Sequence, residues 1–96
     1  MECIVRFDCH ADIIEIPTNI AVRIHEYRNQ FLDWLYDKHN DHDYWVGNKE
    51  GVCYDTDAFV EWLNNNVKSG QTHPITIIEE GIAEDVCPAG MIEIFF

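Results

Sequence analysis

The apolar residues between positions 20 and 35 recur at steps of three and four, and this spacing limits what the chain can fold into more than any other feature. The residues with this spacing are Ile20, Ile24, Tyr27, Phe31, Trp34 and Leu35. Such steps place one apolar stripe along an amphipathic helix, which needs another element to cover that stripe. Thr18 or Asn19 supplies an N-cap side chain. The pattern therefore predicts a helix from about residue 19 to about residue 38.

A second stretch of the chain has the same pattern of residue types as the C-terminal part of this predicted helix. FVEWL begins at Phe59 and matches FLDWL, which begins 28 residues earlier at Phe31. Each stretch places its Phe, Trp and Leu at i, i+3 and i+4, on one face of a helix. The pair could be a repeat, a recognition surface of two tryptophans, or one core reached from two sides. Two units are too few for a repeat array, so we favour the shared core, with Asp33 and Glu61 facing outward.

Short runs of aliphatic, β-branched and aromatic residues flank the two helices. They cover residues 2–7, 12–16, 44–46, 52–54, 75–79 and 91–96. Pro17 ends the second run, because proline has no amide hydrogen to donate to a sheet ladder. Gly47 and Gly51 bracket a polar turn, which favours a hairpin between the third and fourth runs. The last run is so apolar that we expect it to pair within the sheet.

The second helix has its own boundary signals. Asp55 or Thr56 caps it, and the Ser-Gly pair at residues 69 and 70 ends it. Its predicted buried stripe contains Phe59, Val60, Leu63 and Val67, with Trp62 at the margin. The fold class that follows is α+β: a small antiparallel or mixed sheet of about four to six short strands packed against two helices. The predicted order is β-β-α-β-β-α-β-β, within a single compact domain spanning residues 1–96.

The charge of the chain narrows the class of partner. It carries 18 Asp and Glu against 6 Lys and Arg, for a formal net charge of −12. Such a chain repels phosphate backbones and anionic membrane surfaces, so we expect neither nucleic acid nor membrane as a direct partner. A basic protein, including one that itself binds nucleic acid, is the partner that this charge favours.

Aromatic residues add candidate anchors to this acidic surface, since Trp and Tyr are common at interface hot spots. We expect Tyr36 and Trp45 at the surface, because Tyr36 leaves the helical stripe and Trp45 lies in a two-sided hairpin. The residues predicted to form an interaction surface are Asp33, Tyr36, Asp37, Asp41, Asp43, Trp45, Asp57 and Glu61.

Two polar clusters suggest chemistry without matching a known motif. The segment 37–43 contains Asp37, His39, Asp41, His42 and Asp43, which are metal-ligand types, but their spacing fits neither a calcium loop nor HExxH. Cys9, His10 and Asp12 combine a possible nucleophile, base and acid, although neighbours in a strand point to opposite faces. We therefore predict no metal, no cofactor and no catalytic residue. The four cysteines are expected to be reduced, small apolar residues of a cytoplasmic protein, although a pairing of Cys3 with Cys9 is conceivable.

Signatures of common enzymes are missing from the sequence, including GxGxxG, the P-loop, CxxC and GxSxG. A small, acidic chain without enzyme motifs has the profile of many phage-encoded inhibitors (anti-CRISPR-like proteins and nucleic-acid mimics among them) and of immunity-type proteins. The first hypothesis is thus an acidic inhibitor or regulator that occupies a basic surface of a target protein. The alternative is a homo-oligomer, such as a homodimer, that pairs through residues 91–96 or the Trp45 hairpin. A metal- or cysteine-dependent enzyme ranks third.

Overall fold

The computed structural model describes residues 1–7, 10–67, 75–82 and 90–96. Its elements, in chain order, are β1 Glu2–Arg6, β2 Ala11–Glu15, α1 Thr18–Ala21, α2 Ile24–Tyr36, β3 Trp45–Val46, β4 Gly51–Val52, α3 Thr56–Asn66, β5 Thr76–Ile82 and β6 Ile92–Phe95. The predicted α+β class is confirmed, and the order of elements agrees except that the first helix is divided into α1 and α2.

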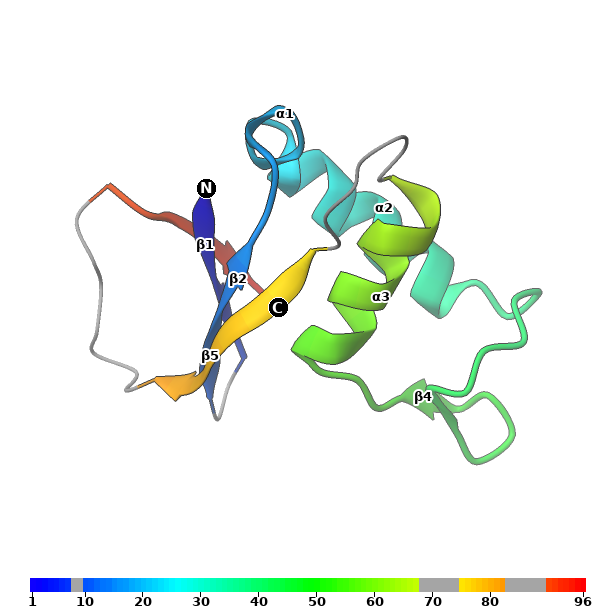
Figure 1. Cartoon of the computed structure of the whole chain (residues 1–96). Coiled ribbons are helices and arrows are strands. Elements are labelled where there is room, and N and C mark those ends of the chain that lie inside the picture. Colours follow the sequence, from blue (N-terminus) through cyan, green and yellow to red (C-terminus); the bar gives the residue numbers. More distant parts are fainter. Residues whose placement is uncertain (8–9, 68–74, 83–89) are drawn as a thin grey trace.

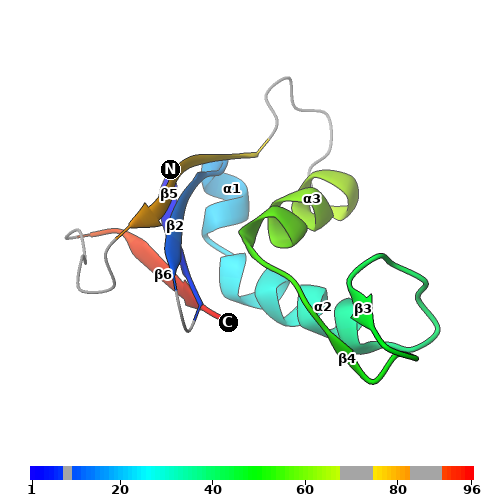
Figure 2. The same cartoon turned by 90° about the horizontal axis from the view of Figure 1, so that it is seen from below.

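The fold has two layers, a four-stranded sheet and the helices that cover one of its faces (Figures 1 and 2). The strand order is β5-β2-β1-β6. β1 pairs antiparallel with β2 and parallel with β6, and β2 pairs antiparallel with β5, so the sheet is mixed. β3 and β4 form a separate two-stranded sheet, which lies beside α2 and α3 and away from the main sheet (Figure 2).

The first helix differs from its sequence-based prediction at both ends and in the middle. α1 starts at Thr18 after an extended Pro17, so neither Thr18 nor Asn19 is the N-cap residue. The helical pattern is interrupted at residues 22–23, where the chain changes direction (Figure 2), and α2 ends at Tyr36 rather than near residue 38. Ile20 and Ile24 stay buried on either side of the break. The apolar stripe was therefore predicted correctly, whereas the continuity of the backbone was not.

The two matching stretches meet in one core, as the shared-core interpretation predicted. Phe31 in α2 and Phe59 in α3 are both fully buried, and their ring centroids lie 5.3 Å apart. Phe31 also lies 5.9 Å from Trp62, ring to ring. The same core cluster includes residues from both ends of the chain, from Cys3 in β1 to Ile94 in β6.

The start of α3 agrees with the prediction, because the Asp55 carboxylate caps the helix by accepting the backbone N–H of Asp57 at 3.0 Å. The predicted stripe on α3 is buried, apart from the half-buried Val67. Trp62 was expected at the margin, yet only 7% of it is exposed. It is buried because it packs under Phe31. The predicted stop at residues 69 and 70 lies outside the described residues.

The C-terminal strand pairs as predicted, but it lies at an edge of the sheet, beside β1 alone among the described strands. Its side chains alternate: Ile94 is buried in the helix-facing core, whereas Phe95 is 60% exposed. Arg28 of α2 donates from Nε to the Phe95 carbonyl oxygen at 3.0 Å, which ties the strand to the helical layer. Among the described residues, no helix has the length and apolar character needed to cross a membrane.

Candidate functional site

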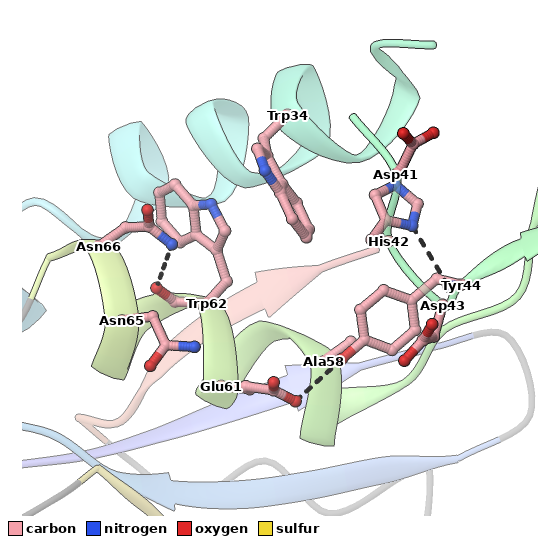
Figure 3. Close-up of a pocket in the computed structure, with 10 residues that line it drawn as sticks. All are labelled: Trp34, Asp41, His42, Asp43, Tyr44, Ala58, Glu61, Trp62, Asn65 and Asn66. Atoms are coloured by element: carbon pink, nitrogen blue, oxygen red, sulfur yellow. Dashed lines mark hydrogen bonds between the residues drawn. The ribbon is translucent and has the colours of Figure 1, made fainter. Parts of the chain in front are cut away.

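A cavity of about 340 Å³ opens between α2, α3 and the loop that joins α2 to β3 (Figure 3). We call it the Trp34 pocket. Its lining residues are Trp34, Asp41, His42, Asp43, Tyr44, Ala58, Glu61, Trp62, Asn65 and Asn66. Trp34 projects from α2 into the space between Trp62 and His42 (Figure 3). The pocket thus combines aromatic walls with acidic and amide side chains.

The loop of residues 37–44 forms one wall because it folds back over the C-terminal end of α2. The last carbonyls of a helix have no partner within the helix, and polar side chains from outside can satisfy them. Asn40 donates from Nδ2 to the Trp34 carbonyl oxygen at 2.9 Å, and His42 Nε2 lies 2.8 Å from the Leu35 carbonyl oxygen. These two hydrogen bonds fix the loop against the helix, with Asp41 and Asp43, the chain neighbours of His42, at the lining of the pocket.

His42 is the centre of an aromatic stack in this wall. Its ring centroid lies 4.8 Å from that of Trp34, with 39° between the planes, and 4.8 Å from that of Trp45, where the two planes differ by only 10°. The backbone N–H of Tyr44 donates to His42 Nδ1 at 3.2 Å, which assigns Nε2 as the donor to Leu35. Both ring nitrogens of His42 are therefore engaged within the protein, and neither is left to coordinate a metal ion.

The opposite wall comes from one face of α3. Ala58, Glu61, Trp62 and Asn65 are spaced at i, i+3, i+4 and i+7, which puts them on one side of the helix. Ala58 leaves room above the helix, and the Glu61 carboxylate accepts the hydroxyl of Tyr44 at 3.1 Å (Figure 3). This bond joins the loop wall to the helix wall across the cavity.

The pocket has a negative electrostatic character. Among the residues that the structure describes, three carboxylates line it and no Lys or Arg does. Burial raises the pKa of the Tyr44 hydroxyl to about 12, with further contributions from its hydrogen bond to Glu61 and from the charges of Glu61, Asp55 and Asp43. A phenol resists ionisation where negative charge is already concentrated. Among the described Lys and Arg residues, none forms an ion pair with Asp43 or Glu61.

Lys49 forms an ion pair with Asp41, one of the carboxylates that line the pocket. Its ammonium lies 2.7 Å from Asp41 Oδ1, 2.5 Å from the Lys38 carbonyl oxygen and 6.0 Å from the centroid of the Trp45 ring. The hydrogen bond to Lys49, and then its charge, lower the pKa of Asp41. Hydrogen bonds from the backbone and side chain of His39 likewise lower the pKa of Asp37.

The eight residues predicted to form an interaction surface do not all lie at one site in the structure. The six acids are exposed, as expected, and so is Tyr36 at 57%. Asp41, Asp43 and Glu61 line the Trp34 pocket, whereas Asp57 lines a separate cavity of about 310 Å³ at the start of α3. The other four predicted residues, Asp33, Tyr36, Asp37 and Trp45, line neither cavity. Trp45 was expected at the surface, but it is half-buried and its ring stacks on that of His42.

Sequence analysis missed the residues that shape this pocket. Trp34 and Trp62 were assigned to the core, where Trp62 is confirmed, and His42 was named among metal-ligand types, so none of the three was expected to line a pocket. The i, i+3, i+4, i+7 spacing of Ala58, Glu61, Trp62 and Asn65 was a usable signal for one wall. No signal in the sequence places Tyr44 against Glu61, since that contact depends on how the loop closes.

The described geometry does not support the metal-site or the cysteine-nucleophile hypothesis for the two polar clusters. In the part of the chain that the structure describes, no three His, Cys, Asp or Glu side chains are grouped closely enough to hold a metal ion. Cys9, the possible nucleophile, lies outside the described residues. His10 Nε2 lies 3.4 Å from the Asp12 carboxylate, but that carboxylate also accepts the Thr56 hydroxyl and, at 2.9 Å, the Gly81 N–H. Asp12 thus has a structural role in joining β2, β5 and α3.

Comparison with known proteins adds no relative from which a role could be transferred. No protein-family model, no curated protein and no solved structure matches this chain.

Proposed function

We propose that this protein is a small acidic inhibitor or regulator that occupies a basic surface of a target protein. The observation that carries the proposal is the Trp34 pocket, where aromatic walls and three carboxylates meet on the loop and α3. Asp33 and Asp37, near the C-terminal end of α2, are also exposed and add to the negative charge at the surface of the protein. A basic partner would be attracted by the charge and held by the aromatic anchors.

Physical reasons support each part of this proposal. Complementary charge accelerates the encounter of two proteins and selects the partner, whereas aromatic residues supply most of the binding energy of a small interface. With a net charge of −12, the chain is suited to a surface rich in Lys and Arg, including one that normally holds nucleic acid. Direct binding to nucleic acid or to an anionic membrane is disfavoured by the same charge.

The class of protein that combines these traits is the phage anti-defence or immunity-type inhibitor. Such a protein acts by occupying its target and carries out no catalysis of its own, and it needs no cofactor. We place it in the cytoplasm, where four cysteines in a small chain stay reduced.

A capture experiment with matched variants tests the proposal. The full chain is compared with D41N/D43N/E61Q, which removes the three carboxylates of the pocket, and with E2Q/E79Q/E80Q, which removes three exposed carboxylates elsewhere. Both variants lose the same charge, so any difference between them reports the site. Proteins captured from an extract of the encoding organism are identified, purified and measured by calorimetry.

We expect a basic target whose affinity falls by roughly tenfold for the pocket variant and by less than about twofold for the control variant. The affinity of the wild-type complex should also fall steeply as NaCl rises from about 50 mM to about 500 mM, since screening shortens the reach of the charges. A complex that is indifferent to salt, or that is weakened equally by both variants, would contradict the proposal.

Homo-oligomerisation is the second candidate, and the exposed edge of the sheet favours it. Phe95 is 60% exposed on β6, an edge strand, and Ile78 is 50% exposed on β5 at the other edge. Unpaired edge strands can pair with a second copy. Light scattering over a range of concentrations would show a dimer that Phe95→Glu disrupts, whereas a monomer at every concentration would remove this candidate.

A further inference from the structure

We propose that the Trp34 pocket receives a single arginine side chain from the basic partner. The inference rests on the proposed function and deepens it, because it names the group that the site recognises. It is drawn from three features of the cavity: its size, its flat aromatic walls and the carboxylates at its rim.

The cavity has the dimensions of a side-chain site rather than of a flat contact. Its volume of about 340 Å³ is at the lower end of the range of small-ligand pockets. Trp34, His42 and Trp62 present planar rings toward it from α2, the loop and α3 (Figure 3). Trp62 is buried and Trp34 packs against the core, so these walls are held in place before a ligand arrives.

The charges at the rim select a cation. Asp43 and Glu61 are exposed and line the cavity, and no described Lys or Arg neutralises them. The Tyr44 hydroxyl donates to Glu61 at 3.1 Å and so holds that carboxylate beside the opening. An anionic ligand would be repelled by this arrangement, and a neutral apolar one would leave the carboxylates poorly solvated.

The chain itself uses the same chemistry elsewhere. The Arg28 guanidinium lies 5.7 Å from the centroid of the Phe96 ring, and the Lys49 ammonium is held jointly by the Asp41 carboxylate and the Trp45 face. Lys49 pairs with Asp41, and no described Lys or Arg pairs with Asp43 or Glu61, so those two carboxylates remain for a cation from outside.

Arginine fits the pocket better than lysine for a geometric reason. A guanidinium is planar, so it can stack on an indole face while its edge donates two hydrogen bonds to a carboxylate. An ammonium is compact and strongly hydrated, and it cannot use both the rings and the carboxylates in one plane. The side-chain amides of Asn65 and Asn66 at the cavity wall offer further acceptor oxygens to the guanidinium edge.

The test uses a minimal probe, N-acetyl-arginine methylamide, added to the full ¹⁵N-labelled chain. The three tryptophan indole N–H signals report its position. We expect Trp34 and Trp62 to shift, whereas Trp45 should move least because it lies outside the lining and donates from Nε1 to the Asn40 carbonyl oxygen at 2.7 Å. The equivalent citrulline probe, which has the same shape without the charge, should cause no saturable shift, and the lysine probe should bind more weakly.

Two isosteric variants locate the contact. Glu61→Gln should weaken the arginine probe by roughly fivefold to tenfold, because the charge is lost while an acceptor for Tyr44 remains. Glu79→Gln removes one exposed charge on β5, outside the pocket, and should change the affinity by less than about twofold. Equal shifts from arginine and citrulline, equal affinity for lysine and arginine, or equal losses in the two variants would overturn the inference.

The outcome is distinguishable from failure of the proposed function. If the arginine probe does not bind but the pocket variant D41N/D43N/E61Q still binds the target protein more weakly than the wild type, the proposed basic partner is supported and only the arginine site is wrong. If the probe binds at Trp34 and Trp62 but no basic protein is captured, the pocket stands and the proposed function is wrong.

Discussion

Phe31 and Phe59, the first residues of the two matching stretches, face each other across the core with 5.3 Å between their ring centroids and an angle of 60° between their planes. This tilted arrangement is a favourable geometry for two aromatic rings. Each stretch therefore supplies one half of a single contact. The likeness of FLDWL and FVEWL reflects a shared task in packing, in which α2 and α3 both contribute to one core.

A double-mutant cycle on this pair should reveal coupling between the two helices. Phe31→Leu and Phe59→Leu should each lower the free energy of unfolding by about 1–2 kcal/mol, because both side chains are fully buried. The double variant should depart from additivity by about 0.5–1.5 kcal/mol, as measured by urea denaturation. Phe31→Leu combined with Cys53→Ser, which changes an exposed residue, should be additive and serves as the control.

The buried carboxylate of Asp12 leads to a second prediction about stability. Thr56 is 1% exposed and donates its hydroxyl to Asp12, itself 5% exposed. Thr56→Val keeps the shape but removes the donor, so it should lower the free energy of unfolding by about 1–3 kcal/mol. Thr56→Ser keeps the hydroxyl and should recover most of that loss in the same urea titration. Equal stability of the Val and Ser variants would show that the hydrogen bond contributes nothing.

The loop wall of the Trp34 pocket should depend on His42 and hardly at all on the neighbouring His39. His42 bridges the Leu35 carbonyl and the Tyr44 N–H, whereas the side chain of His39 is 97% exposed. We expect His42→Ala to accelerate amide hydrogen exchange at Tyr44 by more than about tenfold, since the loop loses both hydrogen bonds of the His42 ring. His39→Ala should leave this exchange nearly unchanged, and similar effects of the two changes would refute the assigned role.

Cys3 makes stability depend on pH in the alkaline range. Burial raises the pKa of its thiol from 9.0 to about 11, so the folded state favours the protonated thiol. The resulting contribution to stability is complete below pH 9.0 and is lost as the pH rises toward 11. Tyr44, whose pKa is raised from 10.0 to about 12, acts in the same direction at higher pH.

We therefore expect the urea concentration at the unfolding midpoint to decrease as the pH is raised from about 8.5 to about 10.5. The decrease should be smaller in Cys3→Ala than in the wild type. Cys53→Ala, which removes an exposed thiol, is the matched control for the loss of a cysteine side chain. At about pH 7.5, iodoacetamide should modify Cys53 in the folded chain and spare Cys3, as read by peptide mass spectrometry. Rapid modification of Cys3 would contradict its burial.

Local periodicity predicted the identity of the elements because it records which face of each segment is buried. The stripe from Ile20 to Leu35 and the Asp55 cap could be read from the sequence, since each depends on residues within a few positions of one another. The break between α1 and α2 could not, because an apolar stripe looks the same whether or not the helix beneath it is continuous.

The candidate site was decided by tertiary structure. Asp57 and Glu61 are one helical turn apart, yet they line different cavities, whereas Asp43 and Glu61, 18 positions apart, line the same one. The sequence by itself determined that these acids would be exposed and that the helices would share a core. Only the closure of the loop over the end of α2, through Asn40 and His42, brought the carboxylates to the tryptophans. Such closure depends on contacts between distant segments, which no local repeat of residue types records.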